Sequence, residues 1–117
     1  MIISQVRLGD FAAIKTVYTV CCFDLFHEGH ADYLERIKRL FPEHKLVVGV
    51  KSDAHITIRK GAGRPIMRQR ARLRVVDAIK HVDYAFICYP DRYTLLKDIH
   101  RLRPVYYVSQ NITNARA

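Results

Sequence analysis

The stretch Thr16-Val-Tyr-Thr-Val-Cys-Cys-Phe-Asp-Leu-Phe-His-Glu-Gly-His30 joins an apolar run to a glycine that is flanked by two histidines. Its first part, Thr16 to Cys22, consists of β-branched, aromatic and cysteine residues, which is typical of a buried strand. The glycine and histidines follow at the point where such a strand gives way to a helix. The stretch therefore predicts a strand–turn–helix unit with His27 and His30 at the turn.

Strand-like and helix-like segments alternate along the rest of the chain. From Gly29 to Phe41 the apolar residues recur at steps of three and four, which is the period of an amphipathic helix. The polar stretch from Lys51 to Met67, with its glycines and proline, predicts a loop, and residues 1–15 receive no assignment. The other expected elements are strands at Leu46–Val50, Tyr84–Cys88 and Val105–Val108, and helices at about Arg68–His81 and Arg92–Leu102. This alternation predicts an α/β fold, a Rossmann-like three-layer sandwich with a mainly parallel sheet.

The composition is that of one globular domain. The chain has 117 residues, of which 50% are hydrophobic and 26% charged, and this length suits a single core. No apolar run approaches the roughly 20 residues that a membrane-spanning helix needs, and no secretory signal is recognisable, so we expect a cytoplasmic protein. The 3 cysteines include a neighbouring pair and lack zinc-site spacing, which indicates reduced thiols.

The charge favours a polyanionic partner. The net charge is +9, and the segment 59–74 is rich in arginine and lysine but contains no acidic residue. Nucleotide phosphates and nucleic acids both satisfy such a charge. The segment has no interleaved aromatic residue on which bases could stack, so we predict a nucleotide and no nucleic acid as partner.

The segment from Cys22 to His30 is suitably placed to bind phosphate. In a parallel α/β sheet, ligands bind at the carboxyl ends of the strands, where helix N-termini present N–H groups and a positive dipole end. Gly29 would let a ligand approach the backbone, and imidazoles three residues apart can face the same side. Such fixed positive charge suits an α-phosphate that gains charge during nucleotidyl transfer.

Phe23-Asp-Leu-Phe-His-Glu-Gly-His30 resembles the His-x-Gly-His signature of the cytidylyltransferase branch of the nucleotidyltransferase superfamily. That branch includes the enzymes that make CDP-choline, CDP-ethanolamine and CDP-glycerol, and the heptose-phosphate nucleotidyltransferases. The likeness covers roughly residues 16–108 and continues at Leu40-Phe-Pro42, Leu46–Asp53, Lys60-Gly61, Arg64-Pro65-Ile66, Arg72 and Val82-Asp83.

The resemblance implies a reaction and a set of site residues. CMP would pass from CTP to a small phosphorylated alcohol of the phosphocholine, phosphoethanolamine or glycerol-3-phosphate type, as in phospholipid biosynthesis, and pyrophosphate would leave. Mg²⁺ would accompany the triphosphate without a dedicated protein site, and the protein would be a homodimer. The implied residues are His27, His30 and Lys60 for catalysis, Cys22, Phe23, Gly29, Arg72 and Ser109 for the nucleotide, and Asp24 and Tyr93 for the acceptor.

The sequence departs from the family pattern at three places. Cys21 stands where a glycine is usual, Ser109–Thr113 replaces a Gly- and Asp-containing segment at the base, and the chain ends at Ala117 without the family's Arg-Thr-x-Gly-Ile-Ser-Thr segment. We therefore expect an N-terminal extension, 1–15, and a nucleotidyltransferase domain, 16–117, that lacks the closing segment. An adenylyltransferase that uses ATP and a nucleotide-binding domain without turnover stay open as alternatives.

Overall fold

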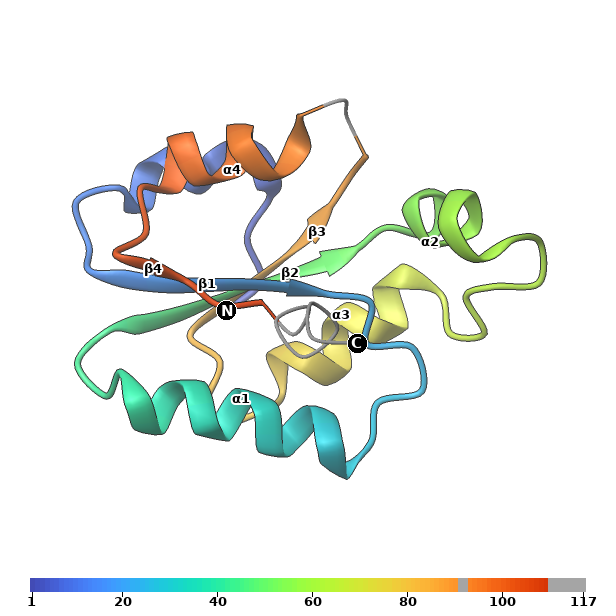
Figure 1. Cartoon of the computed structure of the whole chain (residues 1–117), viewed down its shortest axis with the longest axis horizontal. Helices are drawn as coiled ribbons and strands as arrows, with labels where there is room; N and C mark the ends of the chain where they lie inside the picture. Colours follow the sequence, from blue (N-terminus) through green and yellow to red (C-terminus); the bar gives the residue numbers. More distant parts are fainter. Residues whose placement is uncertain (91–92, 110–117) are drawn as a thin grey trace, which may run out of the picture.

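In the computed structural model, which describes residues 1–90 and 93–109, four parallel strands form one sheet in the order β3-β2-β1-β4 (Figure 1). The sheet is entirely parallel, as the alternating sequence pattern predicts. All the carboxyl ends of the strands consequently lie at one edge, and the strand order reverses beside β1, where such folds bind ligands. The strands are β1 (Thr16–Cys21), β2 (Lys45–Lys51), β3 (Tyr84–Cys88) and β4 (Tyr106–Tyr107).

Helices cover both faces of the sheet. Figure 1 shows α1 (Glu28–Leu40) and α3 (Gln69–Asp77) on one side of the strands and α4 (Thr94–Leu102) on the other. The N-terminal 3₁₀ helix η1 (Gln5–Phe11) packs beside α4 on this second face. The predicted three-layer α/β sandwich is therefore confirmed.

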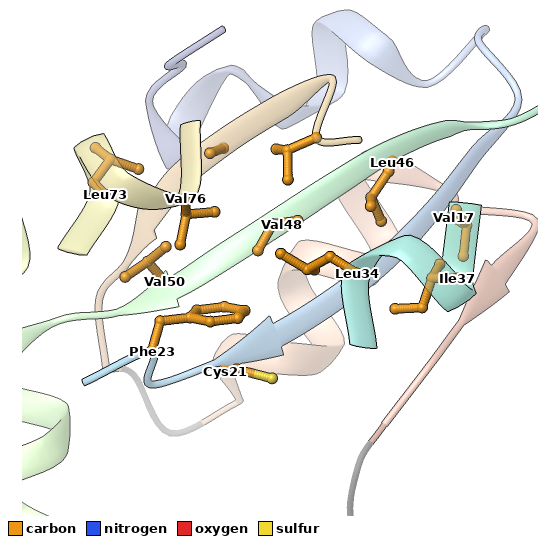
Figure 2. Packing of buried hydrophobic residues seen from close by; sticks show 12 residues of the cluster. Val17, Cys21, Phe23, Leu34, Ile37, Leu46, Val48, Val50, Leu73 and Val76 are labelled. Atoms are coloured by element: carbon orange, nitrogen blue, oxygen red, sulfur yellow. The ribbon is translucent and has the colours of Figure 1, made fainter. Parts of the chain in front are cut away.

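The core between α1, α3 and the sheet is built from the apolar faces that the helical period predicts. Figure 2 shows Leu34 of α1 and Val76 of α3 directed at the strand residues Val48 and Val50, all of them fully buried. Phe23, just past the end of β1, lies in the same cluster beside Val50. The turn that follows β1 is thus anchored in the core by a large ring.

A short helix, α2 (Asp53–Lys60), lies where a loop was predicted between Lys51 and Met67. The hydroxyl of Ser52 caps this helix by accepting a hydrogen bond from the backbone N–H of His55 at 3.2 Å, and Ile56 is 1% exposed. A capping serine and one buried contact stabilise a helix this short. The prediction was wrong because the glycines and proline that indicated a loop all lie beyond its C-terminal end.

Two other helices are shorter than their sequence patterns suggested. Helix α3 ends at Asp77 rather than near His81, and Val82 then donates a turn hydrogen bond to the Ile79 carbonyl at 3.0 Å. The apolar residues Ile79 and Val82 continue the helical spacing of α3, but they belong to turns that pack on the same core. Helix α4 starts at Thr94, and the predicted start at Arg92 lies outside the described residues.

The first residues, 1–15, which the sequence left unassigned, cover part of the sheet. Leu8 of η1 is fully buried in the cluster between η1, α4 and the strands. The side-chain amide of Gln5 donates to both carboxylate oxygens of the buried Asp98 in α4, at 2.9 and 3.2 Å. This segment is therefore packed into the described domain.

The structure also bears on membrane insertion and on the thiols. Across residues 1–90 and 93–109, no helix combines the length and the apolar character needed to cross a membrane. Among the residues that the structure describes, Cys21, Cys22 and Cys88 form no disulfide.

Candidate functional site

A cleft of about 610 Å³ opens at the carboxyl ends of the strands. Its volume is within the range of about 300–1,000 Å³ that is usual for small-molecule sites. The cleft is lined by many of the residues that the sequence singled out, namely Cys22, Phe23, Asp24, His30, Lys60, Tyr93 and Ser109. His27, Gly29 and Arg72 are not among its lining residues.

The two histidines of the turn lie against each other at the start of α1. His27 is the N-cap residue, and its Nδ1 accepts a hydrogen bond from the backbone N–H of Gly29 at 3.0 Å. Nδ1 of His30 accepts from the backbone N–H of His27 at 3.1 Å, and the ring centroids are 4.1 Å apart. The spacing of three residues thus brings the rings together, as predicted.

These backbone contacts fix the tautomer of both rings. A neutral imidazole whose Nδ1 accepts a hydrogen bond carries its proton on Nε2. Burial, together with the neighbouring His27, lowers the pKa of His30, so His30 is neutral near pH 7. Its Nε2–H can still donate to a phosphate oxygen in that state.

Gly29 makes room for the ring of His27. A Cβ at this position would lie 2.8 Å from Cε1 and 3.1 Å from Nδ1 of His27. The sequence predicts that Gly29 admits a ligand to the backbone, but in the structure its backbone N–H donates to the His27 ring. In the structure, this glycine permits the histidine cap.

We expect Gly29→Ala to separate stability from activity. The added methyl group displaces the His27 ring, and the lost cap costs about 1 kcal/mol, while alanine in place of glycine regains a similar amount in helix propensity. The free energy of unfolding should therefore change by less than about 1 kcal/mol, while nucleotidyl transfer falls. Urea denaturation and a pyrophosphate-release assay measure the two effects. Equal activity in the variant would contradict this role of the ring position.

Asp24 ties the segment after α2 to the end of β1. Its carboxylate accepts hydrogen bonds from the backbone N–H groups of Ile66 and Met67, each at 2.8 Å, and Nε of Arg64 lies 3.5 Å away. Burial opposes ionisation of Asp24, but these two N–H groups and the arginine charge together lower its pKa. Asp24 lines the cleft, as expected for an acceptor residue, while its oxygens hold Ile66 and Met67 in place.

Arg72 does not reach the cleft. Its side chain is 0% exposed and donates to the backbone oxygens of Cys22 at 2.7 Å, Lys51 at 2.6 Å and Met67 at 2.9 Å. A fourth hydrogen bond, of 2.8 Å, joins it to Asp53. The geometry therefore does not support the expected contact between Arg72 and the nucleotide. Arg72 instead joins the ends of β1 and β2 to the segment before α3.

The turn between β1 and α1 contains two residues in the left-handed region, Phe23 at φ 55° and Leu25 at φ 53°. The buried Phe23 ring packs edge-on against His30, with a centroid distance of 5.4 Å, and so helps to fix the orientation of the imidazole. Cys21, where the family usually has glycine, ends β1 and has no positive φ. A Cβ is accommodated there within the extended strand.

Four basic residues of the cleft were missing from the site predicted by sequence: Lys51, His55, Arg59 and Arg64. Within the part of the chain that the structure describes, Asp24 is the only carboxylate among the lining residues. The cleft is therefore strongly cationic. His55, Arg59 and Arg64 come after the end of β2. If the sequence had indicated a helix there, the spacing of four residues would have placed His55 and Arg59 on one face of it.

The remaining expected site residues lie at the two ends of the cleft. Lys60 is the last residue of α2, and Tyr93 precedes α4. Ser109 follows β4, and the neighbouring Gln110 and Asn111, considered for base recognition, lie outside the described residues.

A family model described as cytidylyltransferase-like matches residues 18–115. The chain belongs to this cytidylyltransferase-like family. The match contains the His27–His30 turn, the cationic helix α2 and Arg72. Membership of the cytidylyltransferase-like family and the observed fold agree with the resemblance that the sequence motifs indicated.

Curated relatives of this cytidylyltransferase-like domain are much longer proteins. The bifunctional protein HldE of Magnetococcus marinus is 41% identical over 90 residues, which is 77% of this chain and 18% of the relative. HldE of Helicobacter pylori strain 26695 is 40% identical over 90 residues, which is 77% of this chain and 19% of the relative. The chain thus spans about a fifth of the length of these relatives.

A solved structure is also similar. The lipopolysaccharide core biosynthesis protein from Thermoplasma volcanium GSS1 superposes with a TM-score of 0.66 and 28% identity, over 80% of this chain and 72% of that one. The comparisons support an enzyme family that transfers nucleotides. Neither the names of these relatives nor the name of the similar protein mentions CTP or a phospholipid precursor, so the expected role in phospholipid biosynthesis gains no support.

Proposed function

We propose that this domain transfers a nucleotidyl group from a nucleoside triphosphate to the phosphate of a small phosphorylated sugar or alcohol. The supporting observation is the pair of imidazoles at the start of α1, whose Nδ1 atoms are both held by backbone N–H groups. This leaves both Nε2–H groups for phosphate oxygens, and His30 lines the cationic cleft.

The proposed reaction is an in-line displacement at the α-phosphate. An oxygen of the acceptor phosphate forms a bond to the α-phosphorus, the bond from that phosphorus to the bridging oxygen breaks, and pyrophosphate leaves. His27 and His30 would donate to the α-phosphate oxygens as charge develops there. Lys60 and Arg64, both at the cleft, would neutralise the phosphates that depart.

A Mg²⁺ ion carried by the triphosphate fits this cleft. The single lining carboxylate, Asp24, already accepts two backbone hydrogen bonds, and no group of three or more potential metal-ligating side chains occurs among the described residues. Mg²⁺ prefers phosphate oxygens and retained waters to an all-protein cage. When bound, the ion would neutralise phosphate charge, while the residues above position the α-phosphate.

The identities of the two substrates are narrower proposals. The family description favours CTP as donor, and ATP is the alternative that the Lys60-Gly61 and Arg64-Pro65 elements also permit. Similarity to a lipopolysaccharide core biosynthesis protein favours a sugar phosphate as acceptor over a phospholipid headgroup. A homodimer remains a prediction, which light scattering of the purified protein would check.

We expect a nucleoside triphosphate with Mg²⁺ to raise the melting temperature. A ligand at about 100 times its Kd stabilises the folded state by about 2.7 kcal/mol, which corresponds to a shift on the order of 10 °C for a domain of this size. Thermal melts with CTP, ATP, GTP and a short oligonucleotide would show which ligand binds. A shift with the oligonucleotide alone would rule out the transferase.

Turnover is tested separately from binding. Pyrophosphate release should require both the preferred triphosphate and a phosphorylated acceptor, with glycerol 3-phosphate and a hexose 1-phosphate as the first two probes. Tight nucleotide binding without release, across a wide acceptor panel, would favour the alternative of a binding domain without turnover.

A further inference from the structure

Besides the histidine turn, a second group of basic side chains lines the cleft. Lys51 is the last residue of β2, His55 is in the first turn of α2, and Arg59 follows one turn later on the same helix. All three belong to the cleft lining. We call these residues the α2 cluster.

The members of the α2 cluster lie close enough to influence one another. Burial is the main cause that lowers the pKa of His55, and the charges of Lys51 and Arg59 lower it further. Nδ1 of His55 is buried and has no hydrogen-bond partner within the described part of the protein. The cluster therefore places the positive charges of Lys51 and Arg59 next to a histidine with an unsatisfied polar atom.

No described carboxylate balances these charges. The nearest acid in the sequence, Asp53, forms its ion pair with Arg72 at 2.8 Å, and Asp24 accepts from the backbone of Ile66 and Met67. Like charges that are gathered without a counter-charge repel one another. An anionic ligand would remove that repulsion.

The cluster lies next to the site proposed for the α-phosphate, on the side of β1 that faces β2 and β3. The sheet order is β3-β2-β1-β4, and Lys51 of β2 pairs in register with Cys88 of β3. The histidine turn follows β1, and Ser109 follows β4 at the opposite end of the cleft. A nucleotide that extends from Ser109 to the histidines would leave the β2–β3 end for another ligand.

We infer that Lys51, His55 and Arg59 form a binding subsite for the phosphate monoester group of the acceptor. The anion subsite itself follows from the cluster, and only its assignment to the acceptor rests on the proposed function. The subsite would hold the acceptor beside the α-phosphate while the histidines bind the nucleotide. The alternative ligands of this subsite are the β- and γ-phosphates of the nucleotide.

The titration of His55, followed by NMR, tests the subsite without turnover. In the full chain, the imidazole of His55 should titrate below its usual range, and its titration midpoint should rise by about one pH unit or more when inorganic phosphate or glycerol 3-phosphate binds. His55→Gln assigns the signal, and His100, exposed on α4, serves as the internal control. A midpoint that neither anion moves would overturn the subsite.

Matched variants test the other two residues. Lys51→Met and Arg59→Met should each weaken the binding of glycerol 3-phosphate by about tenfold, whereas Arg70→Met, on the exposed side of α3 and outside the cleft, should leave it unchanged. Circular dichroism confirms that each variant is folded. Affinity that stays the same in both cluster variants would also overturn the inference.

Adding the nucleotide distinguishes the two sources of phosphate. The acceptor assignment expects glycerol 3-phosphate to move the His55 signal even when the protein is saturated with Mg²⁺ and the preferred triphosphate. If the triphosphate alone moves the signal and blocks glycerol 3-phosphate, the cluster binds the nucleotide and the acceptor assignment is wrong, although the transferase proposal survives. If no triphosphate binds but phosphate still moves His55, the transferase proposal fails and the anion subsite stands.

Discussion

Replacing His30 with alanine is expected to slow pyrophosphate release by about 10²- to 10³-fold, because a donor to the developing charge on the α-phosphate is lost. The structure gives this ring a defined tautomer, since its Nδ1 accepts from the His27 backbone and leaves Nε2–H as the donor. Its lowered pKa keeps it neutral near pH 7. Steady-state pyrophosphate release, with the fold checked by circular dichroism, measures the effect.

Two further variants isolate the role of Nε2. His30→Asn keeps an oxygen that can accept from the His27 backbone but has no donor at the position of Nε2, so we expect it to restore stability and not turnover. His100→Ala changes an exposed histidine of α4 and should leave the rate unaltered. If His30→Ala turned over at the rate of the unmodified protein, His30 would have to be removed from the catalytic residues.

Arg72→Met is expected to have the largest effect on stability. The substitution leaves the partly buried carboxylate of Asp53 and the backbone oxygens of Cys22, Lys51 and Met67 without their donor. Each acceptor that is left without its donor at a buried site costs about 1–3 kcal/mol, so the total is a large part of the 5–15 kcal/mol that is typical of a whole domain. Urea denaturation of the variant against the unmodified chain provides the measurement.

The control comes from the same helix. Arg74→Met replaces an exposed arginine of α3 and should change the free energy of unfolding by less than about 0.5 kcal/mol. Arg72→Lys should recover only part of the loss, because an ammonium cannot reproduce the planar arrangement of guanidinium donors. Equal stability of Arg72→Met and Arg74→Met would contradict the structural role of Arg72.

The elements that could be predicted from the sequence are those with a strong local pattern. The β-branched run of β1, the periodic apolar face of α1 and the spacing of His27 and His30 each depend on residues close together in the chain. Local patterns determine where a strand or helix forms, and parallel βαβ order then limits the topology. The helix α2 was missed because its apolar face is reduced to a single buried residue, Ile56.

The site was harder to predict because charge in a sequence does not reveal burial. Arg72 and Arg59 look equivalent in the basic segment, but Arg72 is buried among partners that lie up to 50 positions away, whereas Arg59 faces the cleft. Lys51 and His55 were overlooked for a related reason. That they line the same cleft as His30 depends on the order of the strands and on a helix that the composition did not reveal.

Because η1 packs into the core, the stably folded domain includes residues that precede the family match. The family match begins at residue 18, yet Leu8 shares a core cluster with Tyr18 and Phe86. A boundary drawn at the start of the match would uncover an apolar sheet surface and strip Asp98 of its nearest hydrogen-bond donor, Gln5. Any excised or fused version of this domain would therefore have to include the residues of η1, because they are part of the hydrophobic core.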